Sequence, residues 1–241
     1  MTAIDHTGIV TDDNLSIIAA PQSALPESAW QFERVPLGPD DIVAEGADLE
    51  PATLVNAYSH GLFPMPIGRK RLGWFSPQER GIFPLDDFHV SRSLEKSCRR
   101  FRVSLDHDFV GVMRGCGDPR RDHGWINDEF VDAYSRLHQL GYAHSVEVWR
   151  DDELVGGVYG VRIRRFFAGE SMFHRATDAS KVALVGLVDL LRAGGFSLFD
   201  VQWSTPHLAS LRAISLPRPR YLEMLSEAVN DPNGRQTEHH G

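Results

Sequence analysis

The sequence predicts an α+β fold in which a small N-terminal domain precedes a larger domain with a mostly antiparallel sheet flanked by helices. Three observations support this prediction. Helical and strand patterns alternate from about residue 88, three consecutive strand patterns are separated by short turns, and a shorter, less regular stretch comes before them. A chain of 241 residues is long enough to bury a core in one or two such domains.

Composition divides the chain into four segments. Residues 1–28 are acidic and aperiodic and predict a flexible extension, while residues 29–87 form the predicted small domain. Residues 88–229 form the predicted larger domain, and residues 230–241 a polar tail. The sequence lacks an apolar run of the roughly 18–20 residues that cross a bilayer, so we expect a cytoplasmic protein without a membrane partner.

The net charge of −8 is unevenly distributed along the chain. Residues 1–50 carry ten acidic residues and one basic residue, a net charge of −9, whereas the other 191 residues carry a net charge of +1. Residues 69–102 contain nine basic and four acidic residues. This stretch is compatible with a solvated surface or with a track for nucleic-acid phosphates, so the acidic total does not exclude an RNA partner.

In the small domain, residues 51–60 predict a short helix. Pro51 suits the first turn of a helix, apolar side chains recur at helical spacing, and Gly61 follows the last turn. Residues 63–71 are rich in Gly, Pro and basic side chains, and they predict a loop.

The larger domain begins with helical patterns at residues 91–99 and 108–115, with an alternating strand pattern between them at residues 101–105. Residues 127–140 predict a further helix, because an Asn can cap its start and a Gly follows its end. The apolar positions of this helix recur on one face, which predicts that the face is buried.

Three strand patterns follow, and their short turns predict an antiparallel meander over residues 145–150, 154–163 and 165–173. A long helix with an apolar stripe begins after Asp178 and ends before two consecutive Gly residues. The last elements are a strand and two short helices, at residues 196–203, 205–213 and 219–228. This order of elements resembles the N-acetyltransferase (GNAT) fold, so we expect a GNAT-like larger domain.

A carboxylate interrupts an otherwise apolar strand pattern at residues 167–173. Strict alternation places Glu170 on the same face as Ala168 and Met172. A buried carboxylate without a partner is costly, so Glu170 requires a cation, hydrogen bonds or a ligand. An internal salt bridge to an Arg and a pocket for a basic group would both meet this requirement.

Two polar residues lie near the end of the strand predicted at residues 196–203. Asp200 and Gln202 are two positions apart, so alternation places them on one face, roughly 6.5 Å apart at their bases. A hydrogen bond from the Gln202 amide to the Asp200 carboxylate would leave the amide oxygen free to accept from an amine. A solvated pair of polar residues at the edge of a sheet is the alternative.

Two tryptophans, Trp74 and Trp125, lie in segments predicted to be loops. A large ring in a loop either packs against the core or offers a stacking surface. Stacking of a nucleobase on an aromatic side chain is worth about 1–3 kcal/mol, and RNA ends are the usual targets.

Several ordered motifs resemble the leucyl/phenylalanyl-tRNA–protein transferase family over about residues 30–225. The motifs are Gly61-Leu62-Phe63-Pro64-Met65, Gly73-Trp74-Phe75-Ser76-Pro77 with Arg80, Trp125-Ile126, Ala143-His144-Ser145-Val146-Glu147-Val148-Trp149, Leu154-Val155-Gly156-Gly157, Gly169-Glu170-Ser171-Met172-Phe173, Ser180-Lys181-Val182-Ala183-Leu184, Asp200-Val201-Gln202 and His207-Leu208-Ala209-Ser210-Leu211. The sequence departs from the family pattern at Phe75, Thr205 and Arg212.

The resemblance implies an aminoacyltransferase that moves Leu or Phe, and less readily Met, from aminoacyl-tRNA to the α-amine of proteins with N-terminal Arg or Lys. Such a transfer marks those proteins for degradation through the N-end rule. The partners are therefore aminoacyl-tRNA and acceptor proteins, and no cofactor or metal is expected.

The resemblance also implies roles for individual residues. Glu170 would face the basic side chain of the acceptor, and Asp200 and Gln202 would be catalytic residues that handle its α-amine. Trp74 and Trp125 would flank the 3′-terminal adenosine of the tRNA. The expected pocket for the aminoacyl side chain consists of Val158, Phe167, Met172 and Phe199.

Two other functions remain as alternatives. An acyl-CoA N-acetyltransferase would share the GNAT fold, but it would hold pyrophosphate in a basic, Gly-rich loop, and residues 174–179 before the long helix contain no Gly. A non-catalytic tRNA-binding module would use the basic stretch and the tryptophans without a need for the polar residues of the two strands. The sequence contains no P-loop, GxGxxG or HExxH motif.

Overall fold

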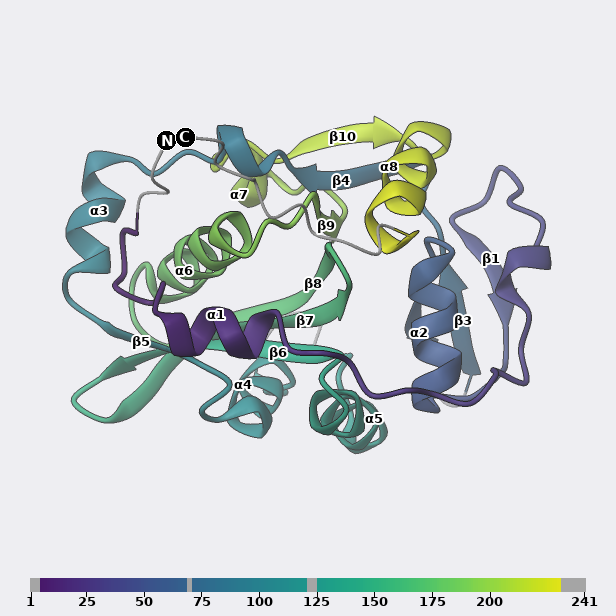
Figure 1. The fold of residues 1–241 in the computed structure, drawn as a ribbon, viewed down its shortest axis with the longest axis horizontal. Helices are drawn as coiled ribbons and strands as arrows, with labels where there is room; N and C mark the ends of the chain where they lie inside the picture. The colour runs from purple at the N-terminus through teal and green to yellow at the C-terminus, as the bar shows by residue number, and fades with distance from the viewer. Residues whose placement is uncertain (1–4, 69–70, 121–124, 231–241) are drawn as a thin grey trace, which may run out of the picture.

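The fold is built on two sheets, seen in a computed structural model that describes residues 5–68, 71–120 and 125–230 (Figure 1). The smaller sheet has the order β1-β3-β2 and comprises β1 (Ile42–Glu45), β2 (Phe63–Ile67) and β3 (Arg71–Phe75). The larger sheet has the order β10-β4-β9-β8-β7-β6-β5. Its strands are β4 (Glu79–Phe83), β5 (Arg102–Leu105), β6 (Ala143–Arg150), β7 (Glu153–Ile163), β8 (Phe166–His174), β9 (Leu198–Gln202) and β10 (Ile214–Pro217).

Helices surround the larger sheet. They are α1 (Asp12–Ile18), α2 (Pro51–Ser59), α3 (Arg92–Cys98), α4 (Phe109–Cys116), α5 (Asp128–Gln139), α6 (Ala179–Ala193), α7 (Pro206–Ala209) and α8 (Arg218–Asn230), with short 3-10 turns at Phe32–Arg34 and Leu85–Asp87. The helix α6 covers one face of the sheet, and α4 and α5 cover the other. An α+β fold with a mostly antiparallel sheet between helices is therefore confirmed.

The antiparallel meander predicted from the sequence is confirmed as β6, β7 and β8. Two Asp residues with positive φ form the turn between β6 and β7. The predicted helices correspond to α2 through α8. The starts of α3 and α5 follow the expected capping chemistry, whereas the side chain of Asp178, expected to cap α6, makes no capping hydrogen bond because this residue has a left-handed conformation. Asn127 caps α5 by accepting from the N–H of Phe130, and Ser91 caps α3 by accepting from the N–H of Leu94.

The small domain differs from its prediction in two respects. The segment predicted as a loop at residues 63–71 forms β2 and the start of β3, with residues 69 and 70 outside the described part. The strand β4 pairs with β9 in the larger sheet, so the division between the sheets falls before β4 and not at residue 88. Strand pairing that links distant parts of the sequence outweighs the local Gly and Pro content here.

The described part of the N-terminal segment packs on the larger domain, although its composition predicted a flexible extension. Ile9 and Ile18 are fully buried in the core that lies over α6. The backbone N–H of His6 donates to the buried carboxylate of Asp189 at 2.8 Å, and the Gln22 amide donates to the carbonyl of Arg162 at 2.6 Å. Sparse apolar anchors and backbone contacts thus hold a segment that has no periodic pattern.

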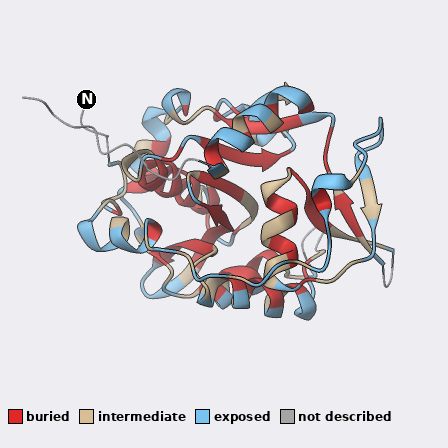
Figure 2. Ribbon diagram, turned by 45° about the vertical axis from the view of Figure 1, so that its right-hand side comes forward, coloured by how far each residue is buried: buried red, intermediate tan, exposed pale blue. Residues whose placement is uncertain are grey.

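Burial is concentrated in the strands of the larger sheet and in α6 (Figure 2). The predicted polar tail at residues 231–241 lies outside the described residues. Within the described ranges, no helix has the length and apolar character needed to cross a membrane.

Candidate functional site

The candidate site lies where two parallel strands separate. The strands β8 and β9 pair only over Phe166–Ala168 and Leu198–Asp200, and beyond these residues a pocket of about 350 Å³ opens between them. Most of its lining is apolar and comes from four elements, β7, β8, α6 and β9, together with α7. The apolar side chains are those of Val158, Met172, Leu184, Phe199, Val201 and Leu208.

Each of the two strands carries a β-bulge at the pocket. Glu170 is the extra residue of β8, opposite the step from Tyr159 to Gly160 of β7. Val201 is the extra residue of β9, opposite the step from Gly81 to Ile82 of β4. A bulge re-aims side chains and is common beside active sites.

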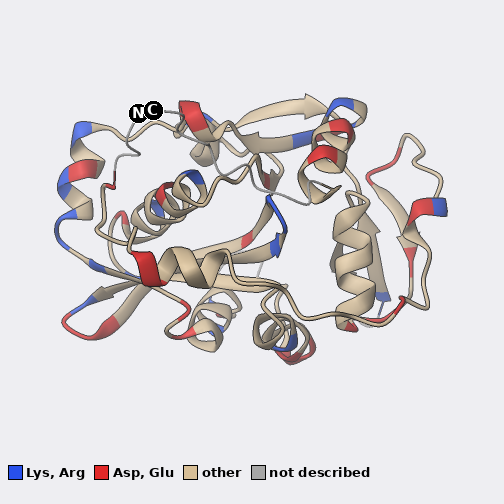
Figure 3. Cartoon of the chain, viewed as in Figure 1, with Lys and Arg blue, Asp and Glu red and all other residues tan. Residues whose placement is uncertain are grey.

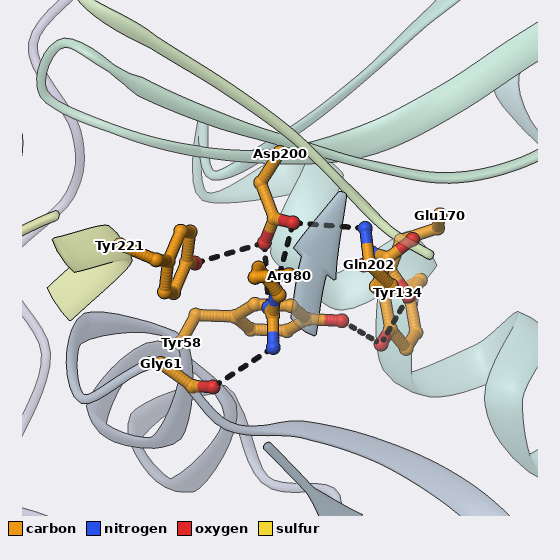
Figure 4. Close-up of polar contacts among 8 residues, drawn as sticks. All are labelled: Tyr58, Gly61, Arg80, Tyr134, Glu170, Asp200, Gln202 and Tyr221. Atoms are coloured by element: carbon orange, nitrogen blue, oxygen red, sulfur yellow. Dashed lines mark hydrogen bonds and ion pairs between the residues drawn. The ribbon is translucent and has the colours of Figure 1, made fainter. Parts of the chain in front are cut away.

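The bulge at Glu170 corrects the prediction from strict alternation. Ala168 packs in the core beside α4 and α5, whereas Met172 packs in the core beside α6. The two residues therefore lie on opposite faces of the sheet, because the extra residue between them reverses the pattern. The Glu170 carboxylate points toward the tyrosines of α2 and α5 (Figure 4).

Three hydroxyl and amide groups surround the Glu170 carboxylate. The Gln202 amide nitrogen Nε2 donates to Glu170 Oε1 at 3.0 Å, and the Tyr134 hydroxyl donates to Oε2 at 3.5 Å. The Tyr58 hydroxyl lies 2.6 Å from the Tyr134 hydroxyl and completes the chain. Burial raises the pKa of Glu170 to about 8, and the nearby Asp200 carboxylate acts in the same direction.

Asp200 is completely buried and is paired with a buried Arg. Arg80 donates from Nε and Nη2 to the two carboxylate oxygens of Asp200 at 2.8 and 2.6 Å, and Tyr221 donates to Oδ2 at 2.9 Å. The backbone N–H of Gln202 donates to Oδ1 at 2.9 Å. Asp200 therefore holds the backbone of Gln202, and the predicted bond to the Gln202 side-chain amide is wrong.

The conformation of Gln202 explains this difference. Its φ is +58°, in the left-handed region that non-Gly residues rarely adopt, so its side chain leaves the alternating pattern of β9. The amide then reaches Glu170 on β8 and not Asp200 two positions back. A positive φ at a pocket-lining residue is a typical form of strain at functional sites.

Arg80 is enclosed by the elements that join the two domains. Its guanidinium lies 4.6 Å from the ring centroids of both Phe63 and Tyr221, and Nη1 donates to the carbonyl of Gly61 at 3.1 Å. Burial alone would lower the pKa of Arg80, but the Asp200 carboxylate more than offsets this effect. The guanidinium therefore remains charged and anchors β9 to β4.

Comparison with known proteins gives matches along most of the chain. The family model described as leucyl/phenylalanyl-tRNA protein transferase matches residues 82–226, and the model of its N-terminal domain matches residues 47–78. Proteins named leucyl/phenylalanyl-tRNA–protein transferase are similar to this chain. The one from Cereibacter sphaeroides is 55% identical over 185 residues, covering 75% of this chain and 86% of the relative.

Similar values are found for other relatives with the same name. The protein from Ruegeria pomeroyi is 52% identical over 186 residues, covering 76% of this chain and 88% of the relative. The protein from Stutzerimonas stutzeri is 47% identical over 199 residues, covering 81% and 88%. The chain belongs to the leucyl/phenylalanyl-tRNA–protein transferase family.

Among solved structures, the structure of L-PGS from Bacillus licheniformis is similar to that of this chain. The TM-score is 0.38 at 13% sequence identity, and the match covers 78% of this chain and 71% of that one.

The structure of the transferase brings most of the predicted site residues together. Val158, Met172 and Phe199 line the pocket, and Phe167 lies behind it with its ring centroid 5.9 Å from that of Phe199. Glu170 and Gln202 meet at one wall of the same pocket, and its other polar lining residues are Ser171, His174, Ser180, Thr205 and His207. Asp200 lies beneath this wall and is fully buried, so it does not line the pocket.

The two tryptophans lie elsewhere. Trp74 is fully buried, donates to the carbonyl of Gly46 at 2.9 Å and packs 4.6 Å from the ring of Phe32. It offers no free face for a nucleobase in this conformation, because its place in β3 directs the ring into the core. Trp125 is partly exposed and packs against Phe130 at 5.1 Å, outside the lining of the pocket.

Sequence reasoning did not assign roles to Arg80, Tyr58, Tyr134 or Tyr221, which complete the polar network. One signal was available for Arg80, since a carboxylate in an apolar strand requires a cation. The tyrosines give no comparable signal in the sequence, because a helical Tyr with apolar neighbours is equally typical of a core. The described residues include no group of three or more His, Cys, Asp or Glu that could hold a metal ion.

Proposed function

We propose that this transferase moves Leu or Phe, and less readily Met, from aminoacyl-tRNA to the α-amine of acceptor proteins that begin with Arg or Lys. The observation that carries the proposal is the shared wall of the pocket. An apolar cavity of about 350 Å³ and the Glu170 carboxylate meet at Gln202, so an esterified apolar residue and a cationic chain start would lie side by side. The names of the relatives support the donor.

The apolar part of the pocket fits the aminoacyl side chain. Burying a Leu or Phe side chain contributes about 1.5–3 kcal/mol, and a single methylene discriminates by only about 1–3 kcal/mol. The side chains of Val158, Met172 and Phe199 offer the aminoacyl side chain apolar contacts. We therefore expect acceptance of Leu, Phe and Met, with rejection of polar side chains.

The carboxylate of Glu170 fits the side chain of an N-terminal Arg or Lys. It is half-buried, and in the described part of the chain its oxygens face Tyr58, Tyr134 and Gln202 without a direct cationic partner. A cationic side chain would supply that partner, and a charged hydrogen bond in a desolvated site is stronger than one in water.

The amine is positioned by Gln202. Its Nε2 donates to Glu170, which leaves Oε1 to accept an N–H of the acceptor amine. Asp200 fixes the backbone of Gln202 in its strained conformation, so it acts as a positioning residue. The aminoacyl ester is already activated and an α-amino group has a reference pKa of about 7.7–8.0, so alignment of a neutral amine with the ester is most of the chemical task.

Other parts of the proposal rest on the family. We expect Trp125, whose ring is partly exposed, to contact the terminal adenosine, whereas stacking on Trp74 would require β3 to move. We expect no cofactor and no metal, a cytoplasmic location and a role in N-end rule degradation. The separation of the parallel strands β8 and β9 at the site supports a GNAT-like larger domain.

A cell-free assay tests the proposal directly. The purified protein is mixed with leucyl-tRNA and a peptide that begins with Arg, and mass spectrometry follows the peptide. The expected product is the peptide extended by one Leu, with little product from a peptide that begins with Asp. Transfer of an acetyl group from acetyl-CoA, or tight tRNA binding with no extended peptide, would reject the proposal in favour of an N-acetyltransferase or a binding module.

A further inference from the structure

An exposed tryptophan lies beside the transfer pocket. Trp203 directly follows Gln202 at the end of β9, and it is 37% exposed. Gln202 and Thr205, on either side of it in the chain, line the pocket, whereas Trp203 itself does not, so the indole lies at the rim. The motifs that resemble the family stop at Gln202 and resume at His207. The resemblance therefore assigns no role to Trp203.

A tight turn at Gln202 directs Trp203 away from the strand. The backbone N–H of Trp203 donates to the carbonyl of Val201 at 2.7 Å, and the φ of the central residue Gln202 is +58°. A three-residue turn with a positive φ is rare and strained. The same turn therefore brings the Gln202 amide to the pocket and the Trp203 indole to the small sheet.

Two phenylalanines of the small sheet hold the indole in place. Phe63 on β2 and Phe75 on β3 pair across the sheet, with ring centroids 5.9 Å apart. The indole is nearly perpendicular to both rings, at 5.1 Å from Phe63 and 6.1 Å from Phe75. Because these three distances are similar, the two rings approach the indole from one side and cover at most one of its faces. Phe75 is also a position at which the sequence departs from the family pattern.

The surroundings of the indole suit a base better than a phosphate group. The strand β2 contains no Lys, Arg, Asp or Glu, and the only such residue of β3 is Arg71, at the end remote from Phe75 (Figure 3). Residues 203–206 are also uncharged. Phosphate oxygens require cations or N–H donors, whereas a nucleobase stacks on an aromatic face.

We propose that Trp203 stacks on the adenine of the 3′-terminal adenosine of the donor tRNA, an inference that rests on the proposed function. The ester joins the aminoacyl group to the ribose of this adenosine. A Leu or Phe side chain in the pocket therefore keeps the base within one sugar of the pocket rim, where Trp203 lies. Trp74 is buried, and Trp125 lies outside the pocket lining.

The packing of the indole favours this role. A ring that is already fixed by Phe63 and Phe75 loses little conformational freedom when a base stacks on it, so most of the stacking energy is available for binding. An adenine has two faces. A contact with Trp203 therefore does not replace the contact expected for Trp125.

Calorimetric titration with two unreactive donor mimics tests the contact. The first mimic is 3′-deoxy-3′-leucylamido-adenosine, and the second is the same leucylamido ribose without a base. Trp203→Leu, which is apolar but not planar, should weaken binding of the adenosine mimic about 5- to 150-fold. Trp203→Phe should retain most of the affinity, and neither substitution should change binding of the abasic mimic.

Trp30 supplies the matched controls, Trp30→Leu and Trp30→Phe. It is 45% exposed, its indole N–H donates to Asp48 at 2.9 Å, and it lies outside the pocket lining. Tryptophan fluorescence gives a second measurement that does not require Trp203→Leu to fold. The adenosine mimic should quench the parent protein, and this quenching should be lost in Trp203→Phe but kept in Trp30→Phe.

Three results would overturn the role of Trp203. They are an adenosine mimic that does not bind the parent or binds Trp203→Leu as tightly as the parent, an equal weakening of both mimics by Trp203→Leu, and quenching that persists in Trp203→Phe. An equal weakening would mean that the substitution displaces the turn at Gln202 and not the base. Failure of the parent to transfer Leu from leucyl-tRNA would instead reject the proposed function, and the titrations do not depend on that transfer.

Discussion

At the scale of single residues, the pKa of Glu170 determines how the acceptor site responds to pH. Burial is the main cause that raises this pKa to about 8, so the carboxyl group is mostly protonated at neutral pH before a cation binds. A carboxyl group gains its charge as pH rises through its pKa. Each unit of pH below about 8 therefore costs up to about tenfold in affinity for a cationic side chain.

We expect the Michaelis constant for an Arg-starting peptide to fall as pH rises from about 6.5 to 8 and then to level off. Glu170→Gln should bind this peptide much more weakly and should lose that part of the pH dependence. The affinity for aminoacyl-tRNA should change little. Steady-state kinetics at several pH values measure both effects, and an equal acceptance of Arg-peptides by Glu170→Gln would contradict the assignment.

Asp200 is predicted to contribute to stability as well as to positioning. Asp200→Asn leaves the Arg80 guanidinium buried without its counter-charge, which costs about 3–5 kcal/mol. Tyr221→Phe removes one hydrogen bond to the same carboxylate and should cost about 1.5–3 kcal/mol. Urea unfolding measures both free energies. Asp200→Asn with a smaller loss than Tyr221→Phe would show that the ion pair does not hold β9 to β4.

The sequence allowed a good prediction of which residues form the site but not of their contacts. Glu170, Gln202 and the apolar residues Val158, Met172 and Phe199 were expected and line one pocket. Their hydrogen bonds were not predictable, because a bulge and a positive φ change the direction of side chains without a local signature in the sequence. For Trp74 the secondary structure itself was predicted wrongly, because its segment was expected to be a loop and is a strand in which Trp74 is buried.

At the scale of elements, the two adjacent bulges place the polar wall of the pocket. Gly81 on β4 allows the turn after Gln202 to approach closely. A Cβ atom at this position would lie 2.6 Å from the backbone nitrogen of Ser204 and from the carbonyl carbon of Trp203. Both of these atoms belong to the backbone, so rotation of a side chain cannot relieve the contact.

Gly81→Ala should therefore shift the turn and misplace the Gln202 amide. A displacement of about 1 Å at a reacting group can cost about 100-fold in rate, and overpacking of this kind costs about 1–3 kcal/mol in stability. Gly38→Ala is the matched control, because no atom lies within 4 Å of the added methyl group. Single-turnover transfer at saturating donor measures the effect. Unchanged transfer by Gly81→Ala would show that the position of this turn does not limit the reaction.

The elements themselves were mostly predictable where the pattern is long. The helix α5 has a capping Asn and a regular apolar stripe, and α6 has an uninterrupted buried face. The strands β1, β2 and β4 are short and contain Gly, Pro or charged residues, so their pairing partners and not their own sequences decide their structure. Long-range pairing cannot be derived from a local pattern.

At the scale of the whole molecule, the N-terminal segment acts as a strap across the larger domain. Ile18 is fully buried beside α6, whereas the adjacent Ile17 is 41% exposed. Ile18→Ala should reduce the free energy of unfolding by about 2–5 kcal/mol, and Ile17→Ala by less than about 0.5 kcal/mol. Chemical denaturation compares the two variants. Equal, small effects on the free energy of unfolding would show that the segment is the flexible extension that its composition predicted.

At the point where β8 and β9 separate, the molecule brings together Gln202 with its strained backbone, the half-buried carboxyl group of Glu170 and an apolar pocket. The central claim is that the esterified residue enters this pocket while the acceptor approaches Glu170. A crystal structure with a non-hydrolysable aminoacyl-adenosine tests it most directly. The claim predicts the Leu or Phe side chain between Val158, Met172 and Phe199, with its carbonyl carbon next to the Gln202 amide. A side chain bound outside this pocket, distant from both Glu170 and Gln202, would contradict it.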